Sequence, residues 1–258
     1  MGEIRIGTSG WHHPGWRGDF YPRGLQQRLE LEFLSRRLTT IELNSPFHGL
    51  RSPADYASWR DRTPEGFVFA VKGHREVTHT RRLRDAAETV AEFFDSGVRE
   101  LGPKLGPVLW QFPPSLPFHR DRVTAFLDAL PPLRHAVEPR HPGFADESFV
   151  DLVRDRNIAL VLPSSGGRWP EPDRPTADFG YVRLHGDREL YRSHYDDVAL
   201  TRWAGRIREL AADGDVFAYF DNTMDGAAPH DAVALADRLT PTAEPGPGGS
   251  RSTSRARR

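Results

Sequence analysis

Two pairs of charged side chains have a spacing that suits acid–base and anion-binding chemistry. Glu138 and Arg140 lie in the stretch VEPRHP, and Arg183 and His185 lie in YVRLHG. Residues two apart in an extended segment project from the same face, so each pair can face one pocket. A carboxylate, two guanidinium groups and an imidazole could together hold an anionic substrate and move a proton. The alternative is a salt-bridge network that closes one end of the fold without any chemistry.

A second group of candidates consists of polar residues that follow short apolar runs. Lys72 ends FVFAVK, and apart from Lys104 all other basic residues of the chain are arginines. Unmatched polar groups in a buried site cost roughly 1–3 kcal/mol each, so we expect these residues to pair or to bind a ligand. The predicted catalytic residues are Glu138 as general base or acid, His185 as its proton partner, and Lys72 as electrophile or anchor. The predicted anion-binding residues are Arg140, Arg183, Asn44, Gln111, Asn222, Arg188, Tyr191 and Trp11.

Two other kinds of chemistry are compatible with these residues. Lys72 could form a Schiff base, since a desolvated lysine loses its proton more easily. Glu138, His141, His185 and Asp221 include the ligand types of zinc and non-haem iron sites. The chain has no compact motif such as HExxH, and two nearby arginines would repel a cation. We therefore predict no cofactor, with a divalent metal as the alternative.

Short apolar runs alternate along the chain with amphipathic stretches, and this alternation must position the candidates. The predicted strands are Ile4–Gly7, Thr40–Leu43, Phe67–Lys72, Pro107–Gln111, His135–Glu138, Ile158–Leu162, Tyr181–Leu184 and Val216–Phe220. The predicted helices are Gln26–Leu38, Pro53–Arg62, Ala86–Leu101, Arg120–Leu130, Ser148–Arg156, Leu200–Ala212 and His230–Leu239. Eight apolar strands joined by helices favour one closed parallel (β/α)8 barrel of the TIM type over an open doubly wound sheet. In such a barrel the C-terminal strand ends form the pocket.

Two segments depart from the strand–helix alternation. Pro163–Gly180 is rich in proline and glycine, so a loop is predicted in place of the sixth helix. Residues 240–258 have almost no apolar side chains and carry four arginines and one glutamate. They are predicted to form a disordered, arginine-rich tail, which leaves residues 1–239 for the barrel.

Composition narrows the classes of function. The 258 residues carry a net charge of −1 and include no cysteine, which excludes disulfides and sulfur-based zinc sites. No apolar run approaches the roughly 18 residues of a membrane span, and the N-terminus lacks a secretory pattern, so a cytoplasmic location without membrane contact is predicted. Without its tail the chain is mildly acidic, which disfavours nucleic acid as a partner. The predicted partner is a small anionic ligand.

Several motifs in strand order resemble those of the YecE-like family, known as domain of unknown function 72. They are GTSGW at 7–11, IELNSPFH at 41–48, FAVKGHREVTH at 69–79, LGPVLWQFPP at 105–114, EPRHPGF at 138–144, YVRLHG at 181–186 and YFDNTMDGAAPHDA at 219–232. The resemblance covers about residues 4–239 and implies a TIM-type barrel in a family without an agreed reaction. The chain departs from the family's usual residues at Pro46, His48, Pro139 and Asp231. It also departs after the sixth predicted strand, where family members commonly have an aspartate and this chain has Pro163-Ser164-Ser165.

These observations favour an enzyme that performs acid–base chemistry on a small anionic molecule, and phosphorylated molecules are among the candidates. A metal-dependent nuclease or other nucleic-acid-processing barrel is the first alternative, by analogy of fold alone. A non-catalytic sensor that binds an anion and reports to a partner is the second. Metal content would separate the first alternative from the leading hypothesis, and turnover of a bound ligand would separate the second.

Overall fold

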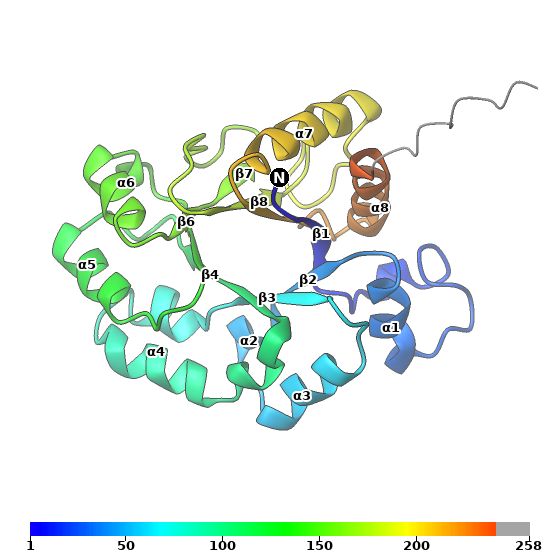
Figure 1. Cartoon of the computed structure of the whole chain (residues 1–258), viewed down its shortest axis with the longest axis horizontal. Helices are drawn as coiled ribbons and strands as arrows, with labels where there is room; N and C mark the ends of the chain where they lie inside the picture. The colour runs from blue at the N-terminus through cyan, green and yellow to red at the C-terminus, as the bar shows by residue number, and fades with distance from the viewer. Residues whose placement is uncertain (241–258) are drawn as a thin grey trace, which may run out of the picture.

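The strands form one parallel sheet that curves into a barrel, with the helices outside it (Figure 1). The computed structural model describes residues 1–240. The strands are β1 (Ile4–Ser9), β2 (Thr40–Leu43), β3 (Val68–Lys72), β4 (Leu105–Phe112), β5 (His135–Pro139), β6 (Ala159–Leu160), β7 (Leu162–Ser164), β8 (Phe179–Leu184) and β9 (Asp215–Phe220). They neighbour one another in the order β6-β5-β4-β3-β2-β1-β9-β8-β7. This arrangement confirms the predicted TIM-type barrel.

The predicted sixth strand is divided between the two ends of this sheet. Its first part, β6, pairs with β5, and its second part, β7, pairs with β8. Only Val161 separates β6 from β7 along the chain, and its backbone N–H still donates to Val137 O at 3.0 Å. The barrel is therefore nearly closed, and the single strand predicted over Ile158–Leu162 is corrected to two short pieces that serve different neighbours.

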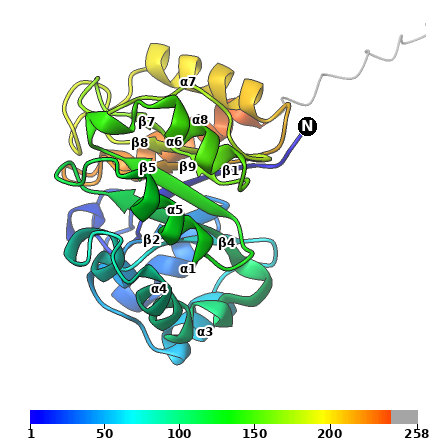
Figure 2. The same cartoon turned by 90° about the vertical axis from the view of Figure 1, so that its left-hand side faces the viewer.

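The helices pack around the strands, as the side view in Figure 2 shows. They are α1 (Glu30–Ser35), α2 (Ser45–His48), α3 (Pro53–Asp61), α4 (Ala86–Asp95), α5 (Arg120–Asp128), α6 (Glu147–Arg154), α7 (Asp197–Leu210) and α8 (Ala227–Leu239). Residues 163–180 contain no helix, as predicted from their proline and glycine content. Nearly all of the predicted tail lies outside the described residues.

Two predicted helices are shorter than expected. The stretch predicted as Gln26–Leu38 is a 3-10 turn, Gln27–Leu29, followed by α1. The stretch predicted as Ala86–Leu101 stops at Asp95, because Gly97 has a φ of 122° that an α-helix cannot contain. A 3-10 segment, Val98–Lys104, then leads into β4.

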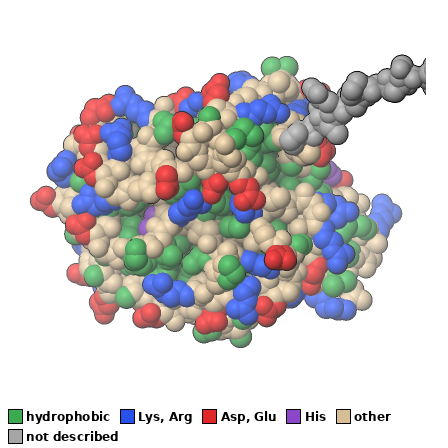
Figure 3. All heavy atoms as spheres, in the orientation of Figure 1, with side chains coloured by type: hydrophobic (Ala, Val, Ile, Leu, Met, Phe, Trp, Pro, Cys, Tyr) green, Lys and Arg blue, Asp and Glu red, His purple; other side chains and the backbone are tan. Residues whose placement is uncertain are grey.

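On the face of the molecule seen in Figure 3, basic and acidic side chains are interspersed rather than gathered into one broad patch. None of the helices within residues 1–240 combines the length and apolar character needed to cross a membrane.

Candidate functional site

Side-chain alternation within the strands builds the site above the apolar interior of the barrel. That interior is filled by residues such as Ala70, Leu109, Ala136, Tyr181 and Tyr219. Two residues further along each strand, the same face carries a polar side chain. These polar residues are Lys72, Gln111, Glu138, Arg183 and Asp221, and Glu42 follows Thr40 on β2 in the same way. One ring of polar side chains therefore closes the C-terminal end of the barrel.

Arg183 on β8 is the centre of this ring. It is 1% exposed, and its guanidinium donates to Glu42 Oε2 at 3.0 Å through Nε and to Glu42 Oε1 at 2.8 Å through Nη2. Nη1 donates to Glu138 Oε2 at 2.8 Å, and Nη2 also lies 3.2 Å from Asp221 Oδ2. Burial alone would lower the pKa of Arg183, but the three carboxylates outweigh it and hold the pKa well above its usual value. Arg183 is therefore a permanent cation.

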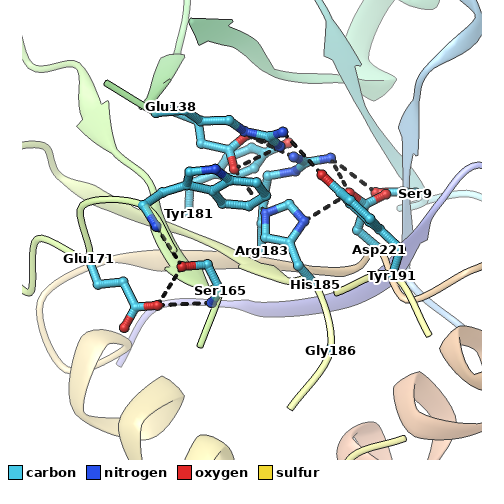
Figure 4. Close-up of polar contacts among 12 residues, drawn as sticks. Ser9, Glu138, Ser165, Glu171, Tyr181, Arg183, His185, Gly186, Tyr191 and Asp221 are labelled. Carbon is cyan, nitrogen blue, oxygen red and sulfur yellow. Dashed lines mark hydrogen bonds and ion pairs between the residues drawn. The ribbon is translucent and has the colours of Figure 1, made fainter. Parts of the chain in front are cut away.

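His185 lies between two carboxylates (Figure 4). Its Nε2 is 2.9 Å from Glu138 Oε1 and its Nδ1 is 2.9 Å from Asp221 Oδ2, so each ring nitrogen faces a carboxylate oxygen. Burial raises the pKa of Glu138, yet Arg140, Arg183 and His185 lower it further and hold it well below the usual range. Burial likewise raises the pKa of Asp221, and Arg183 and His185 reverse that effect. Both carboxylates are ionised at neutral pH.

Arg140 and Trp169 cover this network from one side. Arg140 donates to Tyr191 Oη at 3.1 Å and to Glu138 Oε1 at 3.3 Å. Its guanidinium carbon lies 3.8 Å from the centre of the Trp169 ring, and that ring meets His185 edge-on at 5.0 Å. Arg140 and Trp169 therefore separate Glu138 and His185 from solvent on that side.

The loop that carries Trp169 is held by one carboxylate. Glu171 accepts hydrogen bonds from the N–H of Ser165 at 2.9 Å and from Ser165 Oγ at 2.7 Å (Figure 4). It also accepts from the N–H of Gly167 at 3.1 Å. Ser165 Oγ in turn accepts from the N–H of Trp169 at 3.2 Å. The loop predicted in place of the sixth helix is thus an ordered cover rather than a simple connection.

A cavity of about 510 Å³ opens on the opposite side of Arg183. Polar side chains at the ends of β1, β2, β3 and β9 face aromatic side chains from the first loop and α3 across it. The residues around the cavity are Ser9, Gly10, Trp11, His12, His13, Asn44, Ser45, His48, Arg51, Trp59, Lys72, Arg183, Asp221 and Thr223. Its size and mixed lining suit a small polar ligand.

Lys72 differs from Arg183, the other cation of the ring, because it has no carboxylate partner among residues 1–240. Its ammonium makes no hydrogen bond or ion pair with any residue from 1 to 240, and it lies 4.2 Å from the centre of the Phe47 ring. Burial, followed by the nearby charge of Arg183, lowers the pKa of Lys72 to about 8. Lys72 is therefore a buried amine that can change its protonation state near neutral pH.

The structure divides the predicted site residues into two groups and sets two apart. Lys72, Arg183, Asn44 and Trp11 surround the cavity. Glu138, His185, Arg140 and Tyr191 lie behind Arg183, in contact with one another but outside the cavity wall. Gln111 is buried next to Glu138 in the β4–β5 register and makes no side-chain hydrogen bond within residues 1–240.

Asn222 and Arg188 lie away from the cavity, so the structure does not bring them together with the other predicted residues. Asn222 is fully buried and donates to Ser193 O at 2.9 Å and to Asp231 Oδ2 at 2.8 Å, on the α8 side of the barrel wall. The alternation of β9 turns Asp221 inward and Asn222 outward. The Arg188 side chain is 80% exposed and lies 3.5 Å from Asp196, on the surface.

Sequence reasoning missed Glu42 and Ser9, and it weighed Asp221 as a metal ligand but gave it no part in the acid–base or anion-binding site. Glu42 is buried, accepts from Ser9 Oγ at 2.9 Å and from Tyr181 Oη at 2.8 Å, and anchors Arg183. The signal was present: Glu42 stands two residues before Asn44, the same spacing that singled out Glu138 and Arg140. No comparable signal marked Ser9, because β1 runs two residues beyond its predicted end.

Among residues 1–240 no group of three or more histidine, aspartate and glutamate side chains is placed to hold a metal ion. The carboxylates of the ring contact cations of the chain itself, which leaves them little capacity for a metal. The prediction that no metal is used stays a prediction.

Comparison with known proteins gives concordant results. The family model described as "Protein of unknown function DUF72" matches residues 5–253. The UPF0759 protein YecE of Escherichia coli (strain K12) is 31% identical over 157 residues, which cover 60% of this chain and 55% of that protein. The chain thus matches little more than half the length of this curated relative.

Solved structures agree with the family match. A DUF72 family protein from Thermotoga maritima MSB8 has 26% identity and a TM-score of 0.81, covering 92% of this chain and 99% of that one. A DUF72 family protein from Enterococcus faecalis V583 has 18% identity and a TM-score of 0.78, covering 93% and 97%. The second likeness supports the fold alone.

Proposed function

The chain belongs to the DUF72 family of proteins of unknown function, and from this premise we propose that its barrel mouth is an active site for a small anionic substrate. In this proposal Lys72 gives or takes the proton, and Arg183 and Arg51 hold the anion. Trp11 and Trp59, whose rings meet edge-on at 5.7 Å, contact the less polar part of the substrate.

The position of Lys72 is the observation that carries this proposal. A buried cation without a counter-ion is costly, because burial removes its water and nothing replaces that interaction. Arg51 adds a second cation on the same cavity, and Arg183 faces it as a third. Asp221 is the one carboxylate on this cavity wall, and it already contacts Arg183 and His185. On the cavity wall itself three cations thus face one carboxylate, and an anionic ligand would reduce this local excess.

The proposal gives Glu138 and His185 a positioning role instead of the catalytic role expected from the sequence. Each already has its hydrogen-bonding atoms committed to the ring, and neither borders the cavity. Their contribution is to fix Arg183 and Asp221, whose charges set the field around Lys72.

Binding of simple anions tests the proposal. We expect inorganic phosphate to bind wild-type protein at pH 6.5, as measured by calorimetry, and to bind Lys72→Met and Arg51→Met about tenfold more weakly, as for loss of one charged contact. Arg188→Met is the matched control, because Arg188 lies on the surface away from the cavity. Native mass spectrometry of the purified protein would then identify a ligand for turnover assays.

Two results would contradict the proposal. Phosphate binding that is equally strong in wild type and Lys72→Met would place the anion elsewhere. A tightly bound natural ligand that is never converted would favour the anion sensor over the enzyme.

A further inference from the structure

We propose that Lys72 is a covalent nucleophile that forms a Schiff base with the carbonyl group of a small anionic aldehyde or ketone, such as a 2-oxo acid. This inference rests on the proposed function, because the cavity must first bind the anion. It goes further in naming both the reacting atom and the class of substrate.

The two lysines of the chain show what sets Lys72 apart. Lys104 Nζ donates to Arg60 O at 2.6 Å, to Thr63 O at 2.7 Å and to Thr63 Oγ1 at 3.0 Å. These three acceptors occupy the Nζ of Lys104, and burial lowers the pKa of Lys104 as well. Lys72 Nζ donates to no residue within 1–240, while its side chain borders the cavity. A nucleophilic amine needs a free lone pair, and only Lys72 of the two has a setting that provides one.

The groups around Lys72 favour the neutral amine. The side chain is 9% exposed, Arg183 repels its charge, and Phe47 covers one side. Glu42, Asp221 and Glu138 oppose this effect from β2, β9 and β5, and the resulting pKa is about 8. At pH 7 about one amine in ten is then neutral, against roughly one in three thousand at the ordinary lysine pKa.

His48 and His79 are the titratable groups on the remaining side of Lys72. Burial, then the charge of Lys72, lowers the pKa of His48, and the same two effects lower the pKa of His79 to about 4. Both rings are therefore neutral at pH 7 and add no counter-charge to the amine. Arg183 is the cation that acts on Lys72. Arg75 acts on both histidines, Arg51 on His48 and Arg140 on His79.

The reaction balances without any further reagent. The neutral amine adds to the carbonyl carbon, a C–N bond forms, and the carbonyl oxygen becomes the hydroxyl of a carbinolamine. That hydroxyl leaves as water when the C=N bond forms. Taken from the ammonium form, Lys–NH3⁺ and the carbonyl give a protonated imine and water, so charge and hydrogen atoms are conserved. The protonated imine then draws electrons from the neighbouring carbon, which makes its C–H or C–C bond easier to break.

Unused hydrogen-bonding groups beside the cavity favour an anionic carbonyl over a neutral one. Arg51 Nε and Ser45 Oγ are buried and have no hydrogen-bond partner within residues 1–240, and both side chains border the cavity. Buried polar atoms without partners are rare in folded proteins and point to a missing partner. A carboxylate or phosphate beside the carbonyl would supply oxygen acceptors for this pair of donors once the two side chains turn toward the cavity that their residues line.

Reductive trapping tests the inference on the full chain. The protein is incubated at pH 7 with glyoxylate or pyruvate and sodium cyanoborohydride, which reduces an imine to a stable amine. Only Lys72, Lys104 and the α-amine of Met1 can form such adducts, so peptide mapping by mass spectrometry assigns every product. We expect the adduct at Lys72 to exceed that at Lys104 by at least about tenfold, because Lys72 Nζ makes no hydrogen bond within residues 1–240 and borders the cavity, whereas Lys104 Nζ must give up hydrogen bonds to react.

Three controls sharpen the result. Lys72→Arg keeps the charge and should bind phosphate while forming no adduct at position 72. Acetone, which has a carbonyl but no anionic group, should label Lys72 far less than pyruvate does. Lys104→Arg should leave the labelling of Lys72 unchanged.

The outcomes separate this inference from the proposed function. Equal labelling of Lys72, Lys104 and the α-amine, or no labelling of Lys72, would overturn the Schiff base even when phosphate still binds. Absence of both phosphate binding and labelling would overturn the proposed function as well. Labelling of Lys72 that exceeds the labelling of Lys104 and that phosphate suppresses supports both.

Discussion

Arg183 and Glu42 meet side by side across the barrel mouth, through Nε to Oε2 at 3.0 Å and Nη2 to Oε1 at 2.8 Å. This two-point contact uses the planar fork of the guanidinium, which leaves Nη1 to contact Glu138 on β5. One side chain of β8 thus ties together β2 and β5, which the sheet order separates by β3 and β4. The contact fixes the barrel mouth and aims Arg183 at the cavity.

Replacing Arg183 by lysine should destabilise the protein strongly. A lysine ammonium cannot contact Glu42 at two points and still reach Glu138, so at least one buried carboxylate loses its partner. Breaking a buried pair in this way costs roughly 3–5 kcal/mol. Urea denaturation at pH 7 measures the change, with Arg188→Lys on the surface as the control. A loss below about 1 kcal/mol, the range of exposed pairs, would show that the ring adds little to stability.

Glu138→Gln separates a positioning role from a catalytic one. The amide keeps the shape of the side chain but removes the charge that Arg183, Arg140 and His185 contact. We expect a loss of about 3 kcal/mol in unfolding free energy, with phosphate still bound at the cavity. The same denaturation and calorimetry assays give both values. Unchanged stability together with lost turnover would instead restore Glu138 as a catalytic residue.

The fold was predictable because each strand is a short apolar run bounded by turn residues. The predictions that were wrong concern the bounds of individual elements, which depend on strand pairing and on backbone conformation. The division of the sixth strand at Val161 follows from pairing with both β5 and β8, which no local pattern records. The early end of α4 follows from the positive φ of Gly97. The sequence does not show which of the chain's many glycines adopts such a conformation.

The sequence predicted that the candidate site lies at the C-terminal strand ends, but not which side chains at those ends point into the barrel. Choosing Asn222 over Asp221 ignored the alternation that starts from Phe217 and Tyr219, both of which fill the barrel interior. The same rule would have found Glu42. The cavity position of Lys72, and the burial of Glu138 behind Arg183, depend on how the loops pack and could not be read from spacing.

Substitutions at Asp221 and Asn222 should affect different properties, ligand binding and stability, because these neighbours point to opposite sides of β9. Asp221→Asn removes the one carboxylate from the cavity wall, so phosphate should bind several-fold more tightly at pH 6, where Lys72 is charged. Asn222→Ala should leave phosphate binding unchanged and cost about 1–3 kcal/mol of stability, since it deprives buried Asp231 of a donor. Calorimetry and urea denaturation of both variants check this. Weaker phosphate binding in Asn222→Ala would place that residue in the site after all.

His135 should contribute a distinct loss of stability in mild acid. It accepts from Trp110 Nε1 at 3.1 Å through Nδ1, and its Nε2 lies 2.9 Å from Pro131 O, so the buried ring is neutral. Burial lowers its pKa to about 4. The unfolded chain therefore takes up a proton below about pH 6.5 that the folded protein does not, and stability falls by about 3 kcal/mol as the pH drops from 6.5 to 4.

His135→Asn tests this assignment. Asparagine can still offer an oxygen near Trp110 but does not titrate, so the fall in stability between pH 6.5 and 4 should become shallower by about one proton. His119→Asn, at an exposed position, is the control and should keep the wild-type slope. His79, whose pKa also lies near 4, leaves part of the slope in every variant. Identical slopes in wild type and His135→Asn would contradict the prediction.

Lys72→Met should raise the stability of the ligand-free protein, and the gain should depend on pH. The folded pKa of about 8 lies below the ordinary lysine value of 10.5, so between these values the unfolded chain binds more protons than the folded one. Wild-type stability therefore rises as the pH increases from 8 to 10.5, and below pH 8 the full penalty of the buried charge applies. At about 1.4 kcal/mol per pKa unit that penalty is roughly 3 kcal/mol, and methionine, which is similar in length and uncharged, avoids it.

We expect urea denaturation to show Lys72→Met more stable than wild type by about 2–3 kcal/mol at pH 7, with the difference shrinking by pH 10. Saturating phosphate should reduce the difference at pH 7, because the anion stabilises only the protein that keeps Lys72. A Lys72→Met protein less stable than wild type at pH 7 would mean that Lys72 already has a counter-charge in the folded chain, and the case for an anionic substrate would fail with it.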